Sequence, residues 1–217
     1  MYYNFQIGWL TKMDIRTVDY SQTTYQEYFL DFATQNPFIS EGACFYVYKL
    51  GDSVLKVQRE DYNSDTNKEA YLWLEFCLRN RDSKYIPNIV DYYKLQFKDI
   101  AILCVEVEAL RSVNSILADD IRTIFGSFIT QEYINFSDEF NLSILKRTKE
   151  SKVFKELVEP DFFEFMDKLV LNTKEIARKY GDTSFSCDLH FNNFMVRPST
   201  NNIVVIDHFT CSLYEVE

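Results

Sequence analysis

Two runs of aromatic and β-branched residues joined by Gly-Asp constrain the fold more than any other feature of this sequence. Ala43–Leu50 reads ACFYVYKL and Ser53–Gln58 reads SVLKVQ, with only Gly51 and Asp52 between them. Runs of this composition favour strands, and a two-residue link that begins with glycine favours a tight turn. The sequence therefore predicts a β-hairpin over residues 43–58.

The other segments predict an α+β layout with two unequal lobes, the first rich in strands and the second helical. Helical spacing of apolar residues appears before the hairpin, again after it, and most clearly late in the chain. The expected helices are Tyr25–Phe32, one that begins near Asn67–Lys68, and Pro160–Tyr180 within a mostly helical stretch 110–180; the expected further strands are Ile89–Tyr93, Ile100–Val107, Asn193–Arg197 and Ile203–Ile206.

Composition and charge exclude several classes of function. The 217 residues are 47% hydrophobic and carry a formal net charge of −10, so a basic patch for direct nucleic-acid binding is not expected. The longest apolar run, Ile100–Val105, is too short to cross a membrane, and the first residues lack the order of a signal peptide. Five cysteines without a CxxC pair indicate buried thiols in a reducing compartment rather than a zinc site. We expect a soluble, cytoplasmic protein.

The second strand of the hairpin carries the first residues with a chemical role. Period-two alternation places Val54, Lys56 and Gln58 on one face, where Val54 could contact an adenine and Lys56 could reach phosphates. Gly42, just before the hairpin, could let backbone amides approach a phosphate. The alternative is that Lys56 is an ordinary solvated lysine on the surface of a sheet.

A glutamate follows in the first turn of the next helix. Glu69 lies 13 residues after Lys56 and shares a helix face with the apolar residues Leu72 and Trp73. A carboxylate on a buried face needs a cationic partner, and Lys56 is the obvious one. The alternative is a glutamate that only interacts favourably with the helix macrodipole. Glu75 points elsewhere on the helix and is the weaker candidate.

The segment Cys187–Val196, CDLHFNNFMV, has the most specific pattern. Asp188 and Asn193 lie five residues apart directly before a predicted strand, and Asp207 ends the next strand, 19 residues after Asp188. Hairpin geometry brings Asn193 and Asp207 together, and their oxygens suit a hard ion such as magnesium. A base, two metal ligands and a lysine are what phosphoryl transfer requires. Each aspartate taken singly could instead be a turn or cap residue.

These motifs resemble the protein-kinase-like superfamily. Asp188-Leu189-His190-x-x-Asn193 is similar to the catalytic loop of the aminoglycoside and choline kinase branch, Val54-Leu55-Lys56 to the strand-three lysine motif, and Ile206-Asp207 to the metal-binding aspartate. The order of four segments is most similar to the early serine/threonine protein kinases of T-seven-like bacteriophages: Ser40–Tyr48, Val54–Val57, Tyr85–Asp91 and Phe185–Val196.

The resemblance implies a minimal bilobal protein-kinase-like fold that binds ATP and Mg²⁺ in a cleft. Its parts would be an N-terminal extension (1–37), an N-lobe with an antiparallel sheet and one helix (38–108), and a truncated helical C-lobe with the catalytic loop and metal-binding hairpin (109–217). It further implies an ion pair of Lys56 and Glu69, a hinge facing the adenine, a base with its loop histidine, and metal ligands. In the resemblance, the hinge would be Glu106, Val107 and Glu108. Asp188 would be the base, with His190 on the same loop, and Asn193 and Asp207 would be the metal ligands.

Three departures from the family pattern leave the acceptor open. Asp207-His208-Phe209 lacks the usual glycine, the glycine loop is reduced to Gly42, and the printed sequence ends ten residues after Asp207. We therefore expect residues 110–180, the N-terminal extension or a partner to select the substrate. Three readings follow: a serine/threonine kinase that phosphorylates host proteins to redirect transcription or counter defences, a small-molecule kinase, and a non-catalytic kinase-shaped protein that binds a host protein. The sequence does not indicate an oligomeric state.

Overall fold

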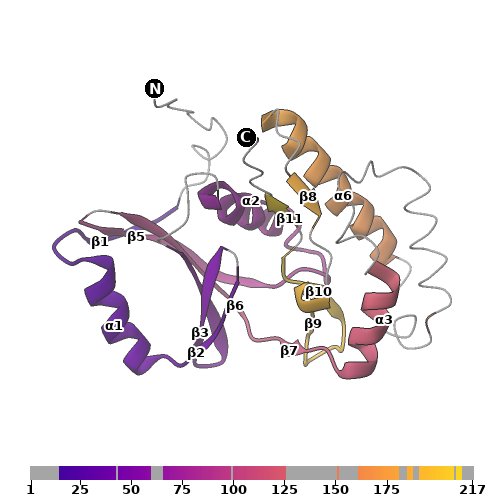
Figure 1. Ribbon diagram of the computed structural model, residues 1–217, viewed down its shortest axis with the longest axis horizontal. Coiled ribbons are helices and arrows are strands. Elements are labelled where there is room, and N and C mark those ends of the chain that lie inside the picture. The colour runs from indigo at the N-terminus through magenta and orange to yellow at the C-terminus, as the bar shows by residue number, and fades with distance from the viewer. Residues whose placement is uncertain are drawn as a thin grey trace, which may run out of the picture. The chain divides into compact units, whose positions relative to one another are not determined.

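The computed structural model describes residues 15–42, 44–59, 66–98, 100–125, 151, 161–180, 185–187, 191–207 and 209–211, whose helices and strands are labelled in Figure 1. The chain divides into two compact units. Unit 1 comprises residues 1–74 and 89–108, and unit 2 comprises residues 75–88 and 109–217. The chain thus passes from unit 1 to unit 2 for the second time between Glu108 and Ala109.

Unit 1 is built on a six-stranded mixed sheet in the order β1-β5-β6-β4-β3-β2. Five strands pair antiparallel, and β1 pairs parallel to β5. The antiparallel sheet expected for residues 38–108 is present, and β1, from the segment 1–37, adds a parallel strand at its edge. The strands are β1 (Thr17–Tyr20), β2 (Phe38–Glu41), β3 (Phe45–Leu50), β4 (Ser53–Gln58), β5 (Ile89–Phe97) and β6 (Ala101–Glu108).

The predicted hairpin is confirmed as β3 and β4. Phe45 pairs with Gln58 at one end of the ladder and Leu50 with Ser53 at the other, so the link contains two residues. Gly51, the first of them, has φ +59°, which glycine adopts without the steric cost of a side chain. The turn therefore fixes the register, and the register determines which side chains of β4 share a face.

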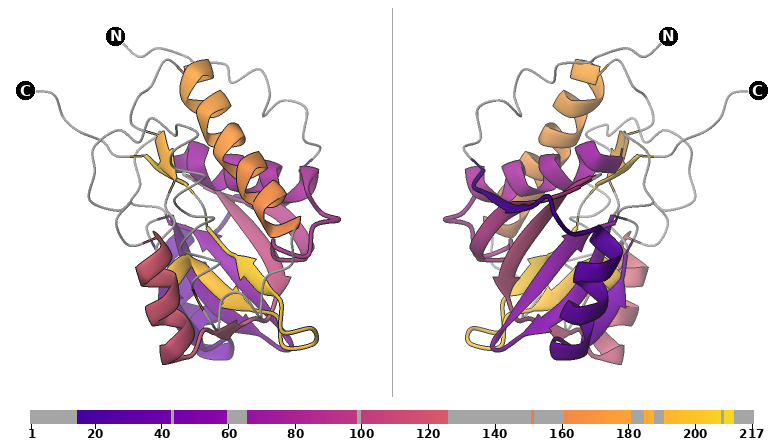
Figure 2. Two further views of the ribbon diagram at one scale, coloured as in Figure 1. Left: turned by 90° about the vertical axis from the view of Figure 1, so that its right-hand side faces the viewer. Right: turned by 90° about the vertical axis from the view of Figure 1, so that its left-hand side faces the viewer.

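Helix α1 (Tyr25–Gln35) covers one face of this sheet, as the right-hand view of Figure 2 shows. Thr24 caps the helix: its hydroxyl accepts from the Glu27 amide while the Glu27 carboxylate accepts from the Thr24 amide. The side chains packed beneath the helix form one buried cluster, which includes Leu55 and Val57 of β4. The helix predicted at Tyr25–Phe32 is therefore confirmed as α1, and it packs on the sheet of unit 1.

Helix α2 (Thr66–Arg79) begins where the sequence predicted and belongs to unit 1 as far as Leu74. Its Trp73 ring packs edge to face on Phe45 of β3, with 5.7 Å between the centroids. Since Leu55 and Val57 point to the α1 side, alternation directs Val54, Lys56 and Gln58 to the opposite side. The predicted face of β4 is confirmed.

In the residues of unit 2 that the structure describes, the secondary structure includes the helices α3 and α6 and several short strands. The strand β9 lies between β10 and β7, and β11 pairs antiparallel with β8. Buried aromatic residues form its core, with the Tyr85 ring 5.1 Å from Phe162 and 5.4 Å from Phe165. The elements are β7 (Arg111–Ser112), α3 (Ser115–Phe125), α6 (Asp161–Tyr180), β8 (Phe185–Cys187), the 3₁₀ turn η2 (Phe191–Asn193), β9 (Phe194–Val196), β10 (Ile203–Val205) and β11 (Phe209–Cys211).

The fold class expected from the sequence is confirmed. The chain is α+β, with a sheet-rich unit followed by a helical one, in the order of elements that the kinase resemblance implies. The cysteines that the structure describes with their side chains, Cys44, Cys77 and Cys104, are buried thiols outside any disulfide, as predicted. Within the described ranges, none of the helices has both the length and the apolar character needed to span a bilayer.

Candidate functional site

Lys56 is buried on β4 rather than solvated. It is 9% exposed, and its ammonium lies 3.9 Å from the centroid of the Trp73 ring and 4.7 Å from that of Phe45. Both distances lie within the range of a cation–π contact. The alternative of an ordinary surface lysine is therefore wrong, because the amine is enclosed by two aromatic side chains of unit 1.

Glu69 is the second buried charge in this region. It is 4% exposed, and its Oε2 accepts a hydrogen bond from the Cys44 thiol at 2.8 Å. Glu69 and Trp73 are four residues apart on α2 and thus occupy one helix face. Cys44, which contacts Glu69, directly precedes Phe45, which contacts Lys56. On the helix, Glu69 lies one turn before Trp73, the other ring that contacts Lys56.

Two buried residues of opposite charge, Lys56 and Glu69, whose contacts include the sequence neighbours Phe45 and Cys44, are the feature of unit 1 that needs an explanation. Removing an ion from water costs several kcal/mol, so a buried ion is tolerated only with compensating contacts. Glu75, in contrast, forms an ion pair with Arg79 one turn further along α2, where the arginine is half exposed. Glu75 is thus partly buried with an arginine partner on its own helix, whereas Glu69 is fully buried and contacts Cys44, which directly precedes β3.

The other nucleotide-binding residues predicted in unit 1 occupy β4, β6 and the start of the hairpin. Val54 pairs with Val107, and the Ser53 hydroxyl donates to the Glu106 carboxylate. Glu108 is the last residue of unit 1, at the crossing where a hinge was expected. The Gly42 amide donates to the Phe45 carbonyl at 2.8 Å, and a Cβ at this position would find ordinary space. A close approach of backbone therefore does not explain this glycine.

Unit 2 brings the two predicted magnesium ligands to adjacent strand ends. The amide of Ile206 donates to the carbonyl of Asn193 at 2.9 Å, and Asp207 follows directly. Asn193 is 8% exposed, and Asp207 is half-buried. Cys187, which precedes Asp188 in the sequence, pairs with Phe209. Asp188 and His190 themselves lie outside the described residues, so their roles stay predictions.

Asn193 and Asp207 have the donor chemistry that magnesium prefers. Mg²⁺ binds oxygen and typically takes only one or two protein ligands beside water and substrate phosphates. One amide and one carboxylate at adjacent strand ends therefore fit this ion. Clusters of three or more His, Cys, Asp or Glu are absent from the part of the chain that the structure describes, so no all-protein metal cage is seen there.

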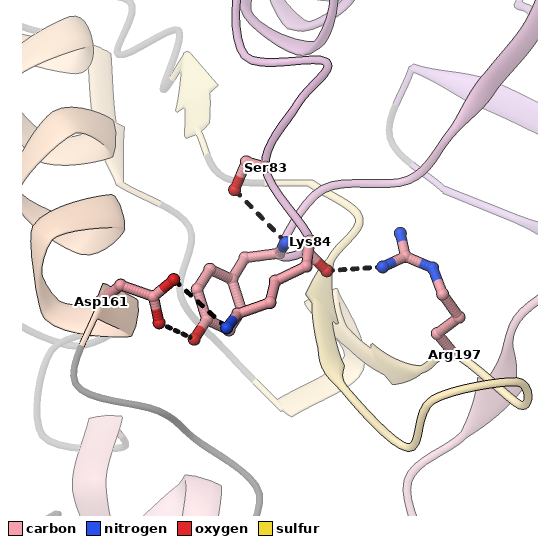
Figure 3. A network of polar contacts seen from close by, with 5 residues as sticks. Ser83, Lys84, Asp161 and Arg197 are labelled. Carbon is pink, nitrogen blue, oxygen red and sulfur yellow. Dashed lines mark hydrogen bonds and ion pairs between the residues drawn. The ribbon is translucent and has the colours of Figure 1, made fainter.

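A separate polar network joins three segments of unit 2 and is drawn in Figure 3. Asp161, the first residue of α6, accepts from the Tyr85 hydroxyl at 2.6 Å and pairs with the Lys84 ammonium at 3.2 Å. The Tyr85 hydrogen bond, with a smaller contribution from Lys84, lowers the pKa of the Asp161 carboxyl. Arg197 is 7% exposed, and its guanidinium donates to the backbone carbonyls of Lys84 and Ile86.

Beside this network lies a pocket of about 420 Å³ whose walls come from the end of α2, the following turn and α6. Its lining carries both signs of charge, with Arg79, Lys84 and Lys168 against Asp82, Asp161 and Glu164. None of the predicted site residues lines it. Mixed charge without a dominant sign does not define a ligand, so the pocket does not alter the interpretation of the site.

Cys44, Phe45 and Trp73 are the residues that the sequence reasoning did not assign to the site. The sequence placed Trp73 on the apolar stripe of the helix and Cys44 within an apolar run, and both statements hold. What could not be read from spacing is that these side chains contact Lys56 and Glu69. The predicted alternation of β4 gave one indication of the Phe45 contact. Phe45 pairs with Gln58, and Gln58 lies on the same face of the sheet as Lys56.

No family model matches this chain, and no curated protein sequence matches it. Among solved structures, a microcompartment-associated aminopropanol kinase shares 16% identity at a TM-score of 0.38, over 83% of this chain and 68% of its own. WbdD bound to the kinase inhibitor LY294002 shares 11% identity at a TM-score of 0.38, over 82% of this chain and 34% of its own. A second WbdD structure shares 12% identity at the same TM-score, over 81% and 34%. This chain thus spans about a third of the WbdD chains, and similarity at this level does not identify a function.

Proposed function

We propose that this protein is a kinase-type phosphotransferase that uses ATP and Mg²⁺. The observation that carries the proposal is the burial of Lys56 against two aromatic rings and of Glu69 against the neighbouring Cys44 thiol in unit 1. A buried charge pair is weak evidence for stability, because apolar residues of similar volume usually stabilise as well. Buried charged groups often mark functional sites, and a fixed cation is what a triphosphate requires.

The remaining roles follow from the chemistry of phosphoryl transfer. Lys56 would hold the phosphates, Glu69 would orient Lys56, and Asn193 and Asp207 would hold the magnesium ion, which neutralises charge on the phosphates when bound. Asp188 would align the acceptor hydroxyl, with His190 on the same loop. Positioning and charge neutralisation supply most of the rate in such enzymes. Val54 and the β6 segment Glu106–Glu108 would contact the adenine.

The finer proposal concerns the acceptor. The resemblance to phage kinases favours serine or threonine hydroxyls of host proteins, and host proteins are then the partners of this chain. A small-molecule acceptor would need the same donor groups, so only the labelled product distinguishes the two. A non-catalytic binding protein would have no chemical need for the buried lysine.

The test is transfer of label from γ-labelled ATP in the presence of Mg²⁺. We expect the wild-type protein to label itself or proteins of a bacterial lysate, and Asp188→Asn and Asp207→Asn to reduce labelling at least a hundredfold. Label confined to small molecules would move the acceptor to that class. Absence of any transfer, together with absence of a rise in Tm on addition of ATP and Mg²⁺, would contradict the phosphotransferase proposal.

A further inference from the structure

The Lys56 ammonium lies over the faces of two aromatic rings, which attract a cation electrostatically in addition to packing against it. Phe45 of β3 and Trp73 of α2, here called the aromatic shelf, lie 4.7 and 3.9 Å from the Lys56 ammonium. We propose that the aromatic shelf is a positioning device that holds the Lys56 ammonium where the phosphates of a nucleotide are met. The inference rests on the phosphotransferase function proposed above and adds the residues that set the position of its lysine.

The two rings restrain the amine in different directions. Their planes are inclined by 63°, with 5.7 Å between the centroids, so they form a corner rather than a flat wall. A lysine has a flexible four-carbon stem, and its ammonium is not oriented by its own geometry. A corner of two electron-rich faces limits the ammonium to one region, which is the requirement of a preorganised electrostatic site.

The indole nitrogen supports a role for the face of Trp73. Trp73 is 2% exposed, and its Nε1 is buried without a hydrogen-bond partner among the described residues. The ring orientation is therefore not set by a hydrogen bond from the indole, although a buried N–H normally finds one. Leaving this donor unused has a cost, and the ring face directed at Lys56 offers a compensating attraction. An aliphatic side chain such as leucine would occupy part of this space without that attraction.

The strength of a cation–π contact suits a lysine that must act on a ligand. A cation–π contact attracts the ammonium to the ring face, and phosphate oxygens offer it charge-assisted hydrogen bonds. Lys56 can therefore be held by the shelf and still engage phosphate when a nucleotide arrives. Glu69, fixed by the Cys44 thiol, lies on the same helix face as Trp73, so one helix presents both the carboxylate and the ring to this region.

The test changes the charge distribution of the Trp73 ring and keeps its shape. The chain has two tryptophans, so a Trp9→Phe protein leaves Trp73 as the only position that incorporates tryptophan analogues with one, two or three fluorine atoms. Fluorine withdraws electrons from the ring face. We expect kcat for label transfer to fall with each fluorine, by about three- to tenfold over the series, while Tm stays constant. A matched pair, Trp73→Phe and Trp73→Leu, should show higher kcat for the variant that keeps a ring.

Each outcome separates this inference from the function on which it rests. Constant kcat across the fluorinated series in an active protein overturns the role of the aromatic shelf and leaves the phosphotransferase function intact. Absence of transfer in the unsubstituted protein overturns the proposed function, and the inference falls with it. A Tm that falls in parallel with kcat would assign Trp73 to packing and would also overturn the inference.

Discussion

The Cys44 thiol donates a hydrogen bond to the Glu69 carboxylate across 2.8 Å, and both side chains are buried in unit 1. The next residue along the strand segment, Phe45, faces the Lys56 ammonium. The start of the hairpin therefore connects to both buried charges through two consecutive residues. A buried carboxylate oxygen that loses a donor carries the cost of its desolvation, so Cys44 has a measurable role in holding Glu69.

Removal of the Cys44 donor tests this relationship. We expect Cys44→Ala to lower the free energy of unfolding by about 1–3 kcal/mol, because the buried Glu69 carboxylate loses a hydrogen-bond donor. Cys44→Ser should recover much of that loss. Denaturant titration measures both. Cys104 is the matched control, since it lies in the apolar cluster beneath α1 and there serine should be worse than alanine. Equal losses for serine and alanine at position 44 would show that the thiol acts only through packing.

Substitution of Lys56 tests the buried cation. We expect Lys56→Met to reduce label transfer by about 10²–10⁴-fold, because the stem is kept while the charge that faces the phosphates is removed. The matched control is Lys49→Met on β3, where the lysine is exposed and the change should leave transfer within about twofold. Comparable transfer by the two variants would contradict the role of Lys56.

The sequence was informative wherever a local pattern determined local structure. The Gly51-Asp52 turn determined the pairing of the hairpin strands. The alternation in β4 placed Val54 and Lys56 on one face, because residues two apart on a strand point to the same side of the sheet. The hairpin of β9 and β10 likewise put Asn193 beside Ile206, next to Asp207. In each case the residues that meet are separated by a short stretch of chain whose geometry is constrained.

Contacts between distant elements were beyond such patterns. Strand β1 has four residues and pairs parallel with β5, where Thr17 lies opposite Lys94, so neither its length nor its alternation distinguished it. Cys44 meets Glu69 only because α2 packs on the sheet. The capping box of α1 was readable from Thr24 and Glu27, yet it says where a helix begins and not which sheet face that helix covers.

The two hydrogen bonds of Arg197 predict a strong preference for arginine. Its two guanidinium nitrogens donate to the carbonyls of Lys84 and Ile86 at 2.7 and 2.8 Å, which ties the β9 end to the segment before β5. A lysine ammonium is a point donor and cannot reproduce this planar fork. We expect Arg197→Lys to lower the free energy of unfolding by about 1–3 kcal/mol, measured by denaturant titration.

Arg79→Lys provides the control for that measurement. Arg79 is half exposed and pairs with Glu75 along α2, so the same substitution there should change the free energy of unfolding by less than about 0.5 kcal/mol. If both arginine variants were equally stable, the two carbonyl contacts of Arg197 would contribute nothing beyond an ordinary surface residue.

Asp161 predicts a pH dependence with a defined sign. The Tyr85 hydroxyl and the Lys84 ammonium lower the pKa of its carboxyl in the folded protein, so the folded state favours the ionised form more than the unfolded state does. The resulting stabilisation is present above the ordinary carboxyl pKa, near 4, and is lost as pH falls through the lower folded value. Because the Asp161 side chain is 54% exposed, solvent screening limits this contribution to a few tenths of a kcal/mol.

The measurement is the difference in Tm between the wild-type protein and Asp161→Asn, followed from pH 7 to pH 3. We expect the wild type to have a higher Tm than Asp161→Asn at pH 7. The difference should shrink below pH 4, because protonation of Asp161 removes the same negative charge that the asparagine substitution removes. Asp167→Asn, an exposed position on the same helix, should give a Tm difference from wild type that is smaller at pH 7. A difference at Asp161 that persists undiminished at pH 3 would mean that the hydrogen bonds there do not depend on ionisation, and the lowered pKa would then be wrong.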